Sequence, residues 1–241
     1  MNDLVILLTG CVNPNGMIFT KLQDKDVRAK QYIEAITWYL NNTNLKIVFT
    51  ENSGYELKSY INKEFYSRIE FLTYNGNDYK KELGKGYGEG LIIDYTLKNS
   101  KFIHSKSNII KITGRLILTN INDIISWYLH HNHNNKLILC DVNRNITTAF
   151  SRVVIAPKSF YSDYFLNEVK KCNDSQGYQF ENALATSIQL CKRLKKYNLS
   201  LFPFPYIFYG VSGSDGNIIK NKSKFTIYTK YFLFKLGIWA K

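Results

Sequence analysis

The chain has 241 residues, of which 45% are hydrophobic and 15% aromatic, and its formal net charge at pH 7 is +13. Such a composition can bury a large core, which excludes a disordered tail and suits one α/β domain or two small ones. The four cysteines form no C-x-x-C pair, which excludes a zinc ribbon and a disulfide scaffold and favours free thiols in a reducing cytoplasm.

The first third of the chain predicts three strands and one helix. An apolar run predicts a buried strand over residues 3–10, and apolar residues at helical spacing follow over 24–42. β-Branched and aromatic residues then predict strands over 45–54 and 69–76. Because no basic residue precedes the first apolar run, it does not resemble a signal peptide, and we expect a cytoplasmic protein.

The middle of the chain continues this alternation. The glycine-rich segment 84–90, "GKGYGEG", is predicted to be a bend that opens a helix over 91–100. Further strands are expected over 109–116, 136–143 and 151–157, with a short helix over 121–131. Strands that alternate with helices predict an α/β fold in which helices flank both faces of a mostly parallel sheet.

Polar residues gather where the predicted strands end. Thr9 and Gly10 close the first strand, the run Glu51, Asn52 and Ser53 closes the second, and the fourth ends in Lys111, Thr113, Gly114 and Arg115. In parallel sheets, ligands bind beyond the carboxyl ends of the strands. We therefore expect these residues around one site. No internal repeat divides the chain, so we expect one domain over 1–216 and a C-terminal extension over 217–241.

Several segments carry a resemblance to a known family: "LLTGCVNPNG" with "KLQDKDVRAKQY", "IVFTENSG", "GKGYGEGLIIDYTL", "IIKITGRL", "NDSQGYQFENA" and "GVSGSDG". The chain resembles the GT-A type of nucleotide-sugar glycosyltransferase, specifically small bacterial enzymes of capsule and lipopolysaccharide (O-antigen) assembly. The resemblance implies a Rossmann-type sheet, a nucleotide-diphosphate sugar as donor and a lipid-linked saccharide as acceptor. It also implies that the first loop and the end of the second strand hold the donor, through Thr9, Gly10, Glu51, Asn52 and Ser53. Arg28 is expected either to reach the donor or to lie on an exposed helix face, and Gly213 lies either in a loop that closes over the donor or in a plain Gly/Ser turn.

The end of the fourth strand departs from that family. Most GT-A enzymes have an Asp-x-Asp motif there that holds a divalent metal on the diphosphate, whereas this chain has Lys-Ile-Thr-Gly-Arg. Cations can stabilise a departing diphosphate as a metal does, so Lys111 and Arg115, with Thr113 and Gly114 between them, are predicted to replace the metal. No metal ion and no cofactor are then expected. The alternative is an ordinary turn with solvated cations.

An inverting transfer also needs a base to deprotonate the acceptor hydroxyl. The resemblance suggests Glu181, which lies at the start of an amphipathic helix, because inverting GT-A enzymes place a catalytic acid in about that location. The alternative is that Glu181 is a first-turn acid that complements the helix dipole.

The last quarter of the chain holds most of the excess positive charge, with ten Lys or Arg from Asn182 onward against one acid, Asp215. Such asymmetry points to an anionic partner. Aromatic residues and lysines interleave in 217–241, so we expect attachment to the inner membrane face, unless these apolar residues pack on the domain. Two other functions stay open. One is a basic nucleic-acid-binding protein, although no nucleic-acid module is recognised and we expect no such partner; the other is a non-catalytic glycosyltransferase-like scaffold.

Overall fold

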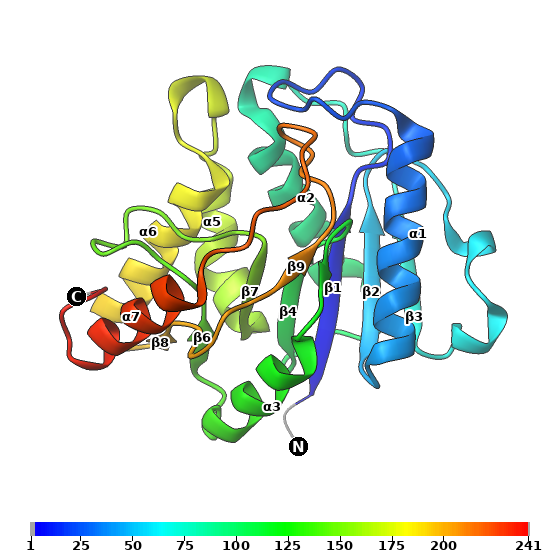
Figure 1. Ribbon diagram of the computed structural model, residues 1–241. Coiled ribbons are helices and arrows are strands. Elements are labelled where there is room, and N and C mark those ends of the chain that lie inside the picture. Colours follow the sequence, from blue (N-terminus) through cyan, green and yellow to red (C-terminus); the bar gives the residue numbers. More distant parts are fainter. Residues whose placement is uncertain (1–2, 241) are drawn as a thin grey trace.

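The computed structural model describes residues 3–240, and within them seven strands form one sheet in the order β3-β2-β1-β4-β7-β6-β8 (Figure 1). β7 is antiparallel to β4 and β6, and the other neighbouring pairs are parallel. The prediction of an α/β fold with a mostly parallel sheet is confirmed. The strands are β1 (Leu4–Gly10), β2 (Lys46–Glu51), β3 (Ile69–Thr73), β4 (Asn108–Thr113), β6 (Leu137–Leu139), β7 (Val153–Pro157) and β8 (Asn198–Ser200).

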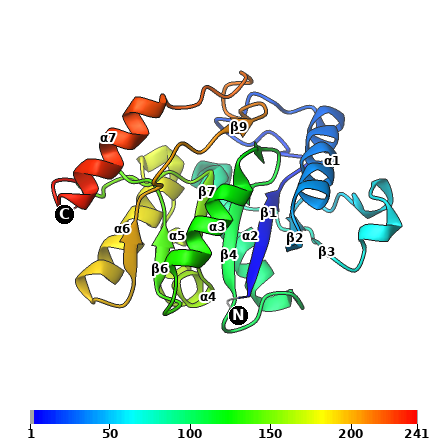
Figure 2. The same ribbon diagram turned by 60° about the horizontal axis from the view of Figure 1, so that its bottom comes forward.

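Helices cover both faces of this sheet (Figures 1 and 2). Alternate residues of β1 point to opposite faces: Ile6 and Leu8 pack with α1 and α3, whereas Val5 and Leu7 pack with α2, α4, α5 and α6. The helices are α1 (Lys25–Asn42), α2 (Gly84–Asn99), α3 (Ile121–His131), α4 (Lys158–Phe160), α5 (Leu166–Val169), α6 (Phe180–Arg193) and α7 (Lys224–Lys235).

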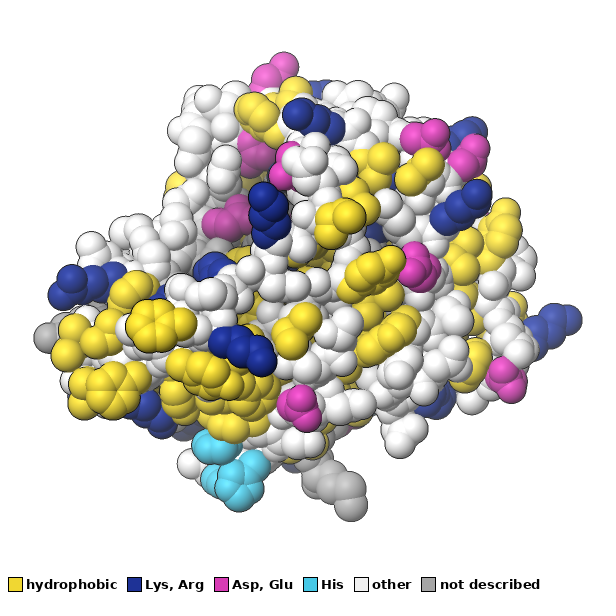
Figure 3. Space-filling view, viewed as in Figure 1, with side chains coloured by type: hydrophobic (Ala, Val, Ile, Leu, Met, Phe, Trp, Pro, Cys, Tyr) yellow, Lys and Arg dark blue, Asp and Glu magenta, His cyan; other side chains and the backbone are white. Residues whose placement is uncertain are grey.

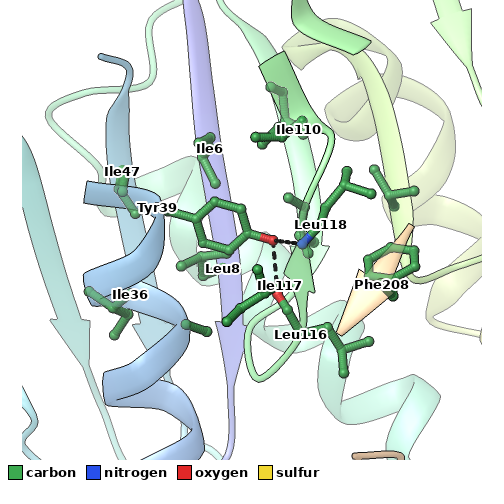
Figure 4. Packing of buried hydrophobic residues seen from close by; sticks show 14 of the residues in the cluster. Ile6, Leu8, Ile36, Tyr39, Ile47, Ile110, Leu116, Ile117, Leu118 and Phe208 are labelled. Carbon is green, nitrogen blue, oxygen red and sulfur yellow. Dashed lines mark hydrogen bonds between the residues drawn. The ribbon is translucent and has the colours of Figure 1, made fainter. Parts of the chain in front are cut away.

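Helix α1 begins where the sequence predicts, because Asp24 caps it. The Oδ1 atom of Asp24 accepts hydrogen bonds from the backbone N–H groups of Asp26 at 2.9 Å and Val27 at 3.0 Å. Farther along α1, the Tyr39 hydroxyl donates to the Leu116 carbonyl at 2.8 Å and accepts from the Leu118 N–H at 2.7 Å (Figure 4). Tyr39 thereby ties α1 to the segment that follows the end of β4.

The predicted bend at 84–90 is wrong, because this segment forms the first turns of α2. Glycine is a poor helix former, and that propensity motivated the prediction. Here the missing side chains allow close packing instead. A Cβ on Gly84 would overlap the carboxylate of Asp174, and a Cβ on Gly90 would stand 2.7 Å from the side chain of Val169. The glycines therefore give α2 a smooth face on which other segments lie.

Three short strands and the three helices α4, α5 and α7 were not predicted. β8 extends the main sheet, and β5 (Ile117–Leu118) pairs with β9 (Phe208–Tyr209) in a separate two-stranded sheet. Helix α7 lies in the predicted extension, and Figure 2 shows it at the side of the molecule where β6 lies, far from α1. No helix among residues 3–240 is both long and apolar enough to cross a membrane.

The segment that contains α7 is tied to the domain by a buried carboxylate. Asp141, just after β6, accepts hydrogen bonds from Lys222 Nζ at 2.9 Å, from the Tyr206 hydroxyl at 2.6 Å and from Lys230. Burial alone would raise the pKa of Asp141, but the ammonium groups of Lys230 and Lys222 outweigh burial and hold that pKa below its ordinary value. Trp239 adds a hydrogen bond from Nε1 to the Val142 carbonyl at 3.0 Å.

Candidate functional site

A pocket of about 340 Å³ lies beyond the carboxyl ends of β1, β2 and β4. The start of α2, the start of α6 and the loop 211–219 complete its walls. In Figure 1 this loop, drawn in orange, passes in front of α2. The pocket brings together eight of the predicted site residues from widely separated parts of the chain: Thr9, Gly10, Arg28, Asn52, Thr113, Arg115, Glu181 and Gly213.

Two buried arginines line this pocket and have only neutral partners. Arg28 on α1 is 5% exposed, and its Nε donates to the Cys11 carbonyl at 2.9 Å. Arg115 is 7% exposed, and its Nη1 donates to the Gln31 side chain at 2.8 Å and to the Val211 carbonyl at 3.1 Å. Within the described residues, neither guanidinium forms an ion pair with a carboxylate.

The two guanidinium groups meet at Gly213. A Cβ on this glycine would overlap Nη2 of Arg115 and stand 3.6 Å from Nη1 of Arg28. Burial lowers the pKa of Arg115 from its ordinary value, and the positive charge of Arg28 adds to this effect, while Tyr32 opposes it. A buried cation without a counter-charge is costly, so this corner of the pocket favours an anion that would balance both charges.

Unpaired polar atoms also point to a ligand. Eight buried side-chain atoms within residues 3–240 lack a hydrogen-bond partner, and four of them belong to residues that line this pocket. These four are Oδ1 of Asn52, Oδ1 of Asn77, Nε of Arg115 and Oδ1 of Asp174. Because native proteins leave few buried polar groups unsatisfied, we expect a polar ligand to pair with atoms of this set.

Lys111 does not line the pocket. Its ammonium is buried, forms an ion pair with Glu89 Oε1 at 2.6 Å and donates to the Ser151 carbonyl at 2.7 Å. Thr9 donates its hydroxyl to the same Glu89 oxygen at 2.7 Å. Since its charge is already balanced by a carboxylate of α2, Lys111 supports the pocket wall and is not free to contact a diphosphate.

Glu181 lines the pocket from the first turn of α6. Its Oε1 accepts a hydrogen bond from the Ser151 hydroxyl at 2.6 Å, and its carbonyl accepts from the Ala149 N–H at 3.0 Å. The carboxylate is therefore held in place while it faces the pocket. This position agrees with both alternatives for Glu181, since a first-turn acid and a base within reach of a ligand would look alike here.

Asp174 is a further pocket carboxylate, 8% exposed, which lies in a short turn before α6 and packs against Gly84 at the start of α2. Burial raises the pKa of Asp174; the charge of Lys85 and the backbone N–H groups of Lys85 and Gly86 lower it, and Glu181 raises it. Glu89 and Glu181 also line the pocket, but so do Lys85 and Arg152, and Glu89 is paired with Lys111. Charges of both signs therefore line the pocket.

Three predicted residues lie behind the pocket and shape it. Glu51 is fully buried, and its carboxylate accepts backbone hydrogen bonds from Val12, Ser53 and Tyr55 at 2.8 to 2.9 Å, which holds the loops after β1 and β2 together. Ser53 accepts a hydrogen bond from the Asn13 N–H at 2.9 Å. A Cβ on Gly114 would stand 2.6 Å from the Thr9 carbonyl, so glycine allows the ends of β1 and β4 to approach closely.

The donor set at the end of β4 does not suit a divalent metal. Thr113, Gly114 and Arg115 offer no carboxylate, and hard divalent cations prefer several carboxylate or carbonyl oxygens. Across residues 3–240, no three His, Cys, Asp or Glu side chains gather closely enough to hold a metal ion.

Sequence reasoning missed Glu89 and Ser151, and it gave Asp174 only a secondary role. Glu89 stands inside the glycine-rich segment, where a lone acid among glycines was a usable signal. Asp174 was interpreted as a turn residue before the helix of Glu181 and as a second choice for the base, not as a residue that lines the pocket. Ser151 carried no signal, because its importance depends on how β7 lies beside α6.

No family model matches the sequence, and no curated protein matches it. Solved structures do match. HddC from Yersinia pseudotuberculosis matches with a TM-score of 0.40 at 16% identity, over 87% of this chain and 93% of HddC. The galactosyltransferase LgtC in complex with donor and acceptor sugar analogs matches with a TM-score of 0.49 at 8% identity, over 81% of this chain and 73% of LgtC.

A third match is CMP:2-keto-3-deoxy-manno-octonic acid synthetase complexed with CTP. Its TM-score is 0.41 at 10% identity, over 83% of this chain and 89% of the synthetase. Identities this low and TM-scores below 0.5 transfer no residue role, so the pocket is interpreted from its own side chains.

Proposed function

We propose that this chain is a glycosyltransferase of GT-A type that moves a sugar from a nucleotide-diphosphate donor to a saccharide acceptor. The observation that carries this proposal is the pair of buried arginines, Arg28 and Arg115, without carboxylate partners among the described residues, at the strand-end pocket. Guanidinium groups bind phosphate through charge-assisted hydrogen bonds. The pocket volume also lies in the range of about 300–1,000 Å³ that small-molecule sites occupy.

The arginines would stabilise the charge that leaves with the nucleotide. When the bond between the anomeric carbon and the phosphate oxygen breaks, the electron pair stays on the diphosphate, and preorganised cations favour that state. We assign this role to Arg28 and Arg115, with Lys111 holding the pocket wall through Glu89. A divalent metal would then not be required.

The nucleotide would lie against the ends of β1 and β2. Thr9 and Gly10 line this part of the pocket, and the buried, unpaired Oδ1 of Asn52 could accept a hydrogen bond from a base or ribose. Gly213, in the loop over the arginines, would allow the backbone to approach the diphosphate closely.

Glu181 would act as the base. In an inverting transfer it would accept the proton of the acceptor hydroxyl while that oxygen forms its bond to the anomeric carbon, and the nucleoside diphosphate leaves from the opposite side. The hydrogen bond from Ser151 would keep the carboxylate aimed at the pocket. Asp174 is the next candidate, because it lines the same wall.

The acceptor is proposed to be a lipid-linked saccharide of surface polysaccharide assembly, used at the cytoplasmic membrane face. This part of the proposal draws on the resemblance of the sequence segments and on the basic C-terminal quarter, which contains ten Lys or Arg and one acid.

A nucleotide panel tests the proposed function. UDP, GDP, dTDP and their sugars should raise the melting temperature of the protein, and at least one sugar nucleotide should be hydrolysed slowly without acceptor. Stabilisation by an oligonucleotide and not by nucleotides would favour a nucleic-acid-binding protein. Pyrophosphate release from a nucleoside triphosphate and a sugar phosphate would make the protein a nucleotidyltransferase, and nucleotide binding without turnover of any donor would indicate a scaffold.

A further inference from the structure

Helix α7 is apolar on two sides, and only one of them is covered. The inward side carries Ile227, which is 3% exposed, together with the partly buried Tyr231 and Phe234. Lys230 lies on the same side and reaches the buried Asp141. These contacts fix the helix on the domain and account for about half of its apolar residues.

The outward side of α7 carries an exposed apolar stripe. Phe225, Tyr228, Phe232 and Leu236 follow one another at intervals of three or four residues, so they share one helix face. Their exposed fractions are 80%, 50%, 62% and 56%. Figure 3 shows hydrophobic side chains gathered over α7 at the lower left of the molecule. A contiguous exposed patch of this kind indicates a surface that something else covers.

The positive charge around the stripe favours an anionic binding partner. Residues 217–241 contain six lysines and no acid. Lys224 and Lys235 are exposed near the two ends of the stripe, and Lys220 is exposed just before α7. Lysines that flank large aromatic and aliphatic side chains are typical of helices that lie in the interface of anionic bilayers.

We propose that the outward face of α7 docks on an anionic lipid bilayer, with the helix parallel to the membrane plane. The four stripe side chains would enter the boundary between headgroups and acyl chains, and the lysines would contact anionic headgroups. Each lysine near such a surface contributes about 1 kcal/mol, which corresponds to roughly a fivefold change in affinity.

Two other occupants fit the exposed face of α7 less well. A second copy of the chain would bring two lysine-rich segments together without any acid from 217–241 to balance them, and like charges across an interface are unfavourable. A single-stranded nucleic acid would stack bases on aromatic rings, but Leu236 offers no ring and Tyr228 is half-covered.

The docking face is joined directly to the pocket. The loop 211–219 lines the pocket, and α7 begins at Lys224, five residues farther along. Both lie on the side of the molecule that faces the viewer in Figure 1. Docking would therefore hold the pocket near the bilayer. The inference does not depend on sugar transfer, because the chemistry of the α7 face alone carries it.

Flotation of the full-length protein tests the inference. The probes are vesicles of phosphatidylcholine mixed with phosphatidylglycerol, and vesicles of phosphatidylcholine alone, each at low and at high salt. The variant Phe225→Ser/Phe232→Ser removes two exposed rings and should leave the fold intact. The matched control is Tyr60→Ser, since Tyr60 is 59% exposed in the segment between β2 and β3, at the opposite end of the molecule.

We expect the wild type and Tyr60→Ser to float with the anionic vesicles at low salt and to be released at high salt. The double serine variant should bind at least about tenfold more weakly at an unchanged melting temperature. Lys224→Gln/Lys235→Gln should weaken binding to anionic vesicles by about tenfold or more. The inference is overturned if the wild type stays in the dense fraction with both vesicles. It is equally overturned if the double serine variant binds the vesicles normally. It is also overturned if the wild type forms a dimer or binds an oligonucleotide and the double serine substitution abolishes that interaction instead.

Discussion

Gly213 and Arg115 lie so close together that the glycine has no room for a side chain: a Cβ would overlap Nη2 of the arginine. The two residues are almost a hundred positions apart, and the contact joins the end of β4 to the loop that closes the pocket. Arg115 also donates to the carbonyl of Val211 in the same loop at 3.1 Å. The loop and the guanidinium therefore form one unit at the corner of the pocket.

Gly213→Ala should weaken nucleotide diphosphate binding by roughly tenfold, because the new methyl group would displace the Arg115 guanidinium and cost part of a charge-assisted hydrogen bond. Calorimetric titration with UDP and GDP measures this loss. Asn217→Ala, an exposed change in the same loop, is the control and should bind normally. Equal affinity of Gly213→Ala and wild type would show that Arg115 does not contact the nucleotide.

Lys111→Met and Arg115→Ala should behave in opposite ways. Removing Lys111 leaves the Glu89 carboxylate unpaired, which should lower the free energy of unfolding by about 3 kcal/mol, while the folded protein still binds nucleotide. Arg115→Ala removes a buried, unbalanced charge, so stability should be kept while nucleotide affinity falls roughly 10- to 100-fold. Urea denaturation and calorimetry measure the two quantities.

The double variant Lys111→Met/Glu89→Gln provides the control, because it removes both charges and should recover much of the lost stability. If Lys111→Met is fully stable and yet fails to bind nucleotide, then Lys111 contacts the ligand and the pairing with Glu89 is not its main role.

Six of the seven strands of the main sheet could be predicted, because they stand in the sequence as mostly apolar runs. All seven residues of β1 are buried, and the capping residue Asp24 marks the start of α1. The glycine-rich start of α2 could not be predicted in the same way, since local propensity opposes a helix there. Its glycines are explained by partners about 80 to 90 residues away, such as Asp174 and Val169.

The site was predictable in outline only. Strand ends pointed to Thr9, Asn52 and Arg115, because the topology of parallel sheets is general. Which cation is free depends on contacts between distant segments. Lys111 and Arg115 look equivalent in the sequence, but Lys111 points to Glu89 on α2, whereas Arg115 meets only neutral groups.

Asp174→Asn should alter how stability depends on pH. Because burial raises the pKa of Asp174 in the folded state, the carboxyl contributes stability below about pH 4, and this contribution is lost as pH rises through the folded pKa. Asparagine has no such titration. As the pH rises from 4 to 7, the melting temperature of the variant should therefore increase relative to that of the wild type. A difference in melting temperature between variant and wild type that stays constant over this pH range would contradict the expectation.

Glu181→Gln should leave the fold and donor affinity nearly intact and lower turnover by about a hundredfold or more, as loss of a general base does. Glutamine can still accept the hydrogen bond from Ser151, so packing should change little. Steady-state kinetics with the donor found in the nucleotide panel measures the effect. Near-normal turnover would make Glu181 a helix-start acid, and Asp174, which lines the same pocket, would be tested next as the base.

Donor turnover should survive chelation by EDTA. The end of β4 offers Thr113, Gly114 and Arg115 where a metal would need carboxylates, and two arginines already bring positive charge to the same pocket. Added manganese should not restore Arg115→Ala, because no group of suitable ligands within residues 3–240 would hold the ion in place of the guanidinium. Strict dependence of the wild type on manganese, or rescue of Arg115→Ala by it, would show that a metal and not the arginine pair carries the charge of the leaving diphosphate.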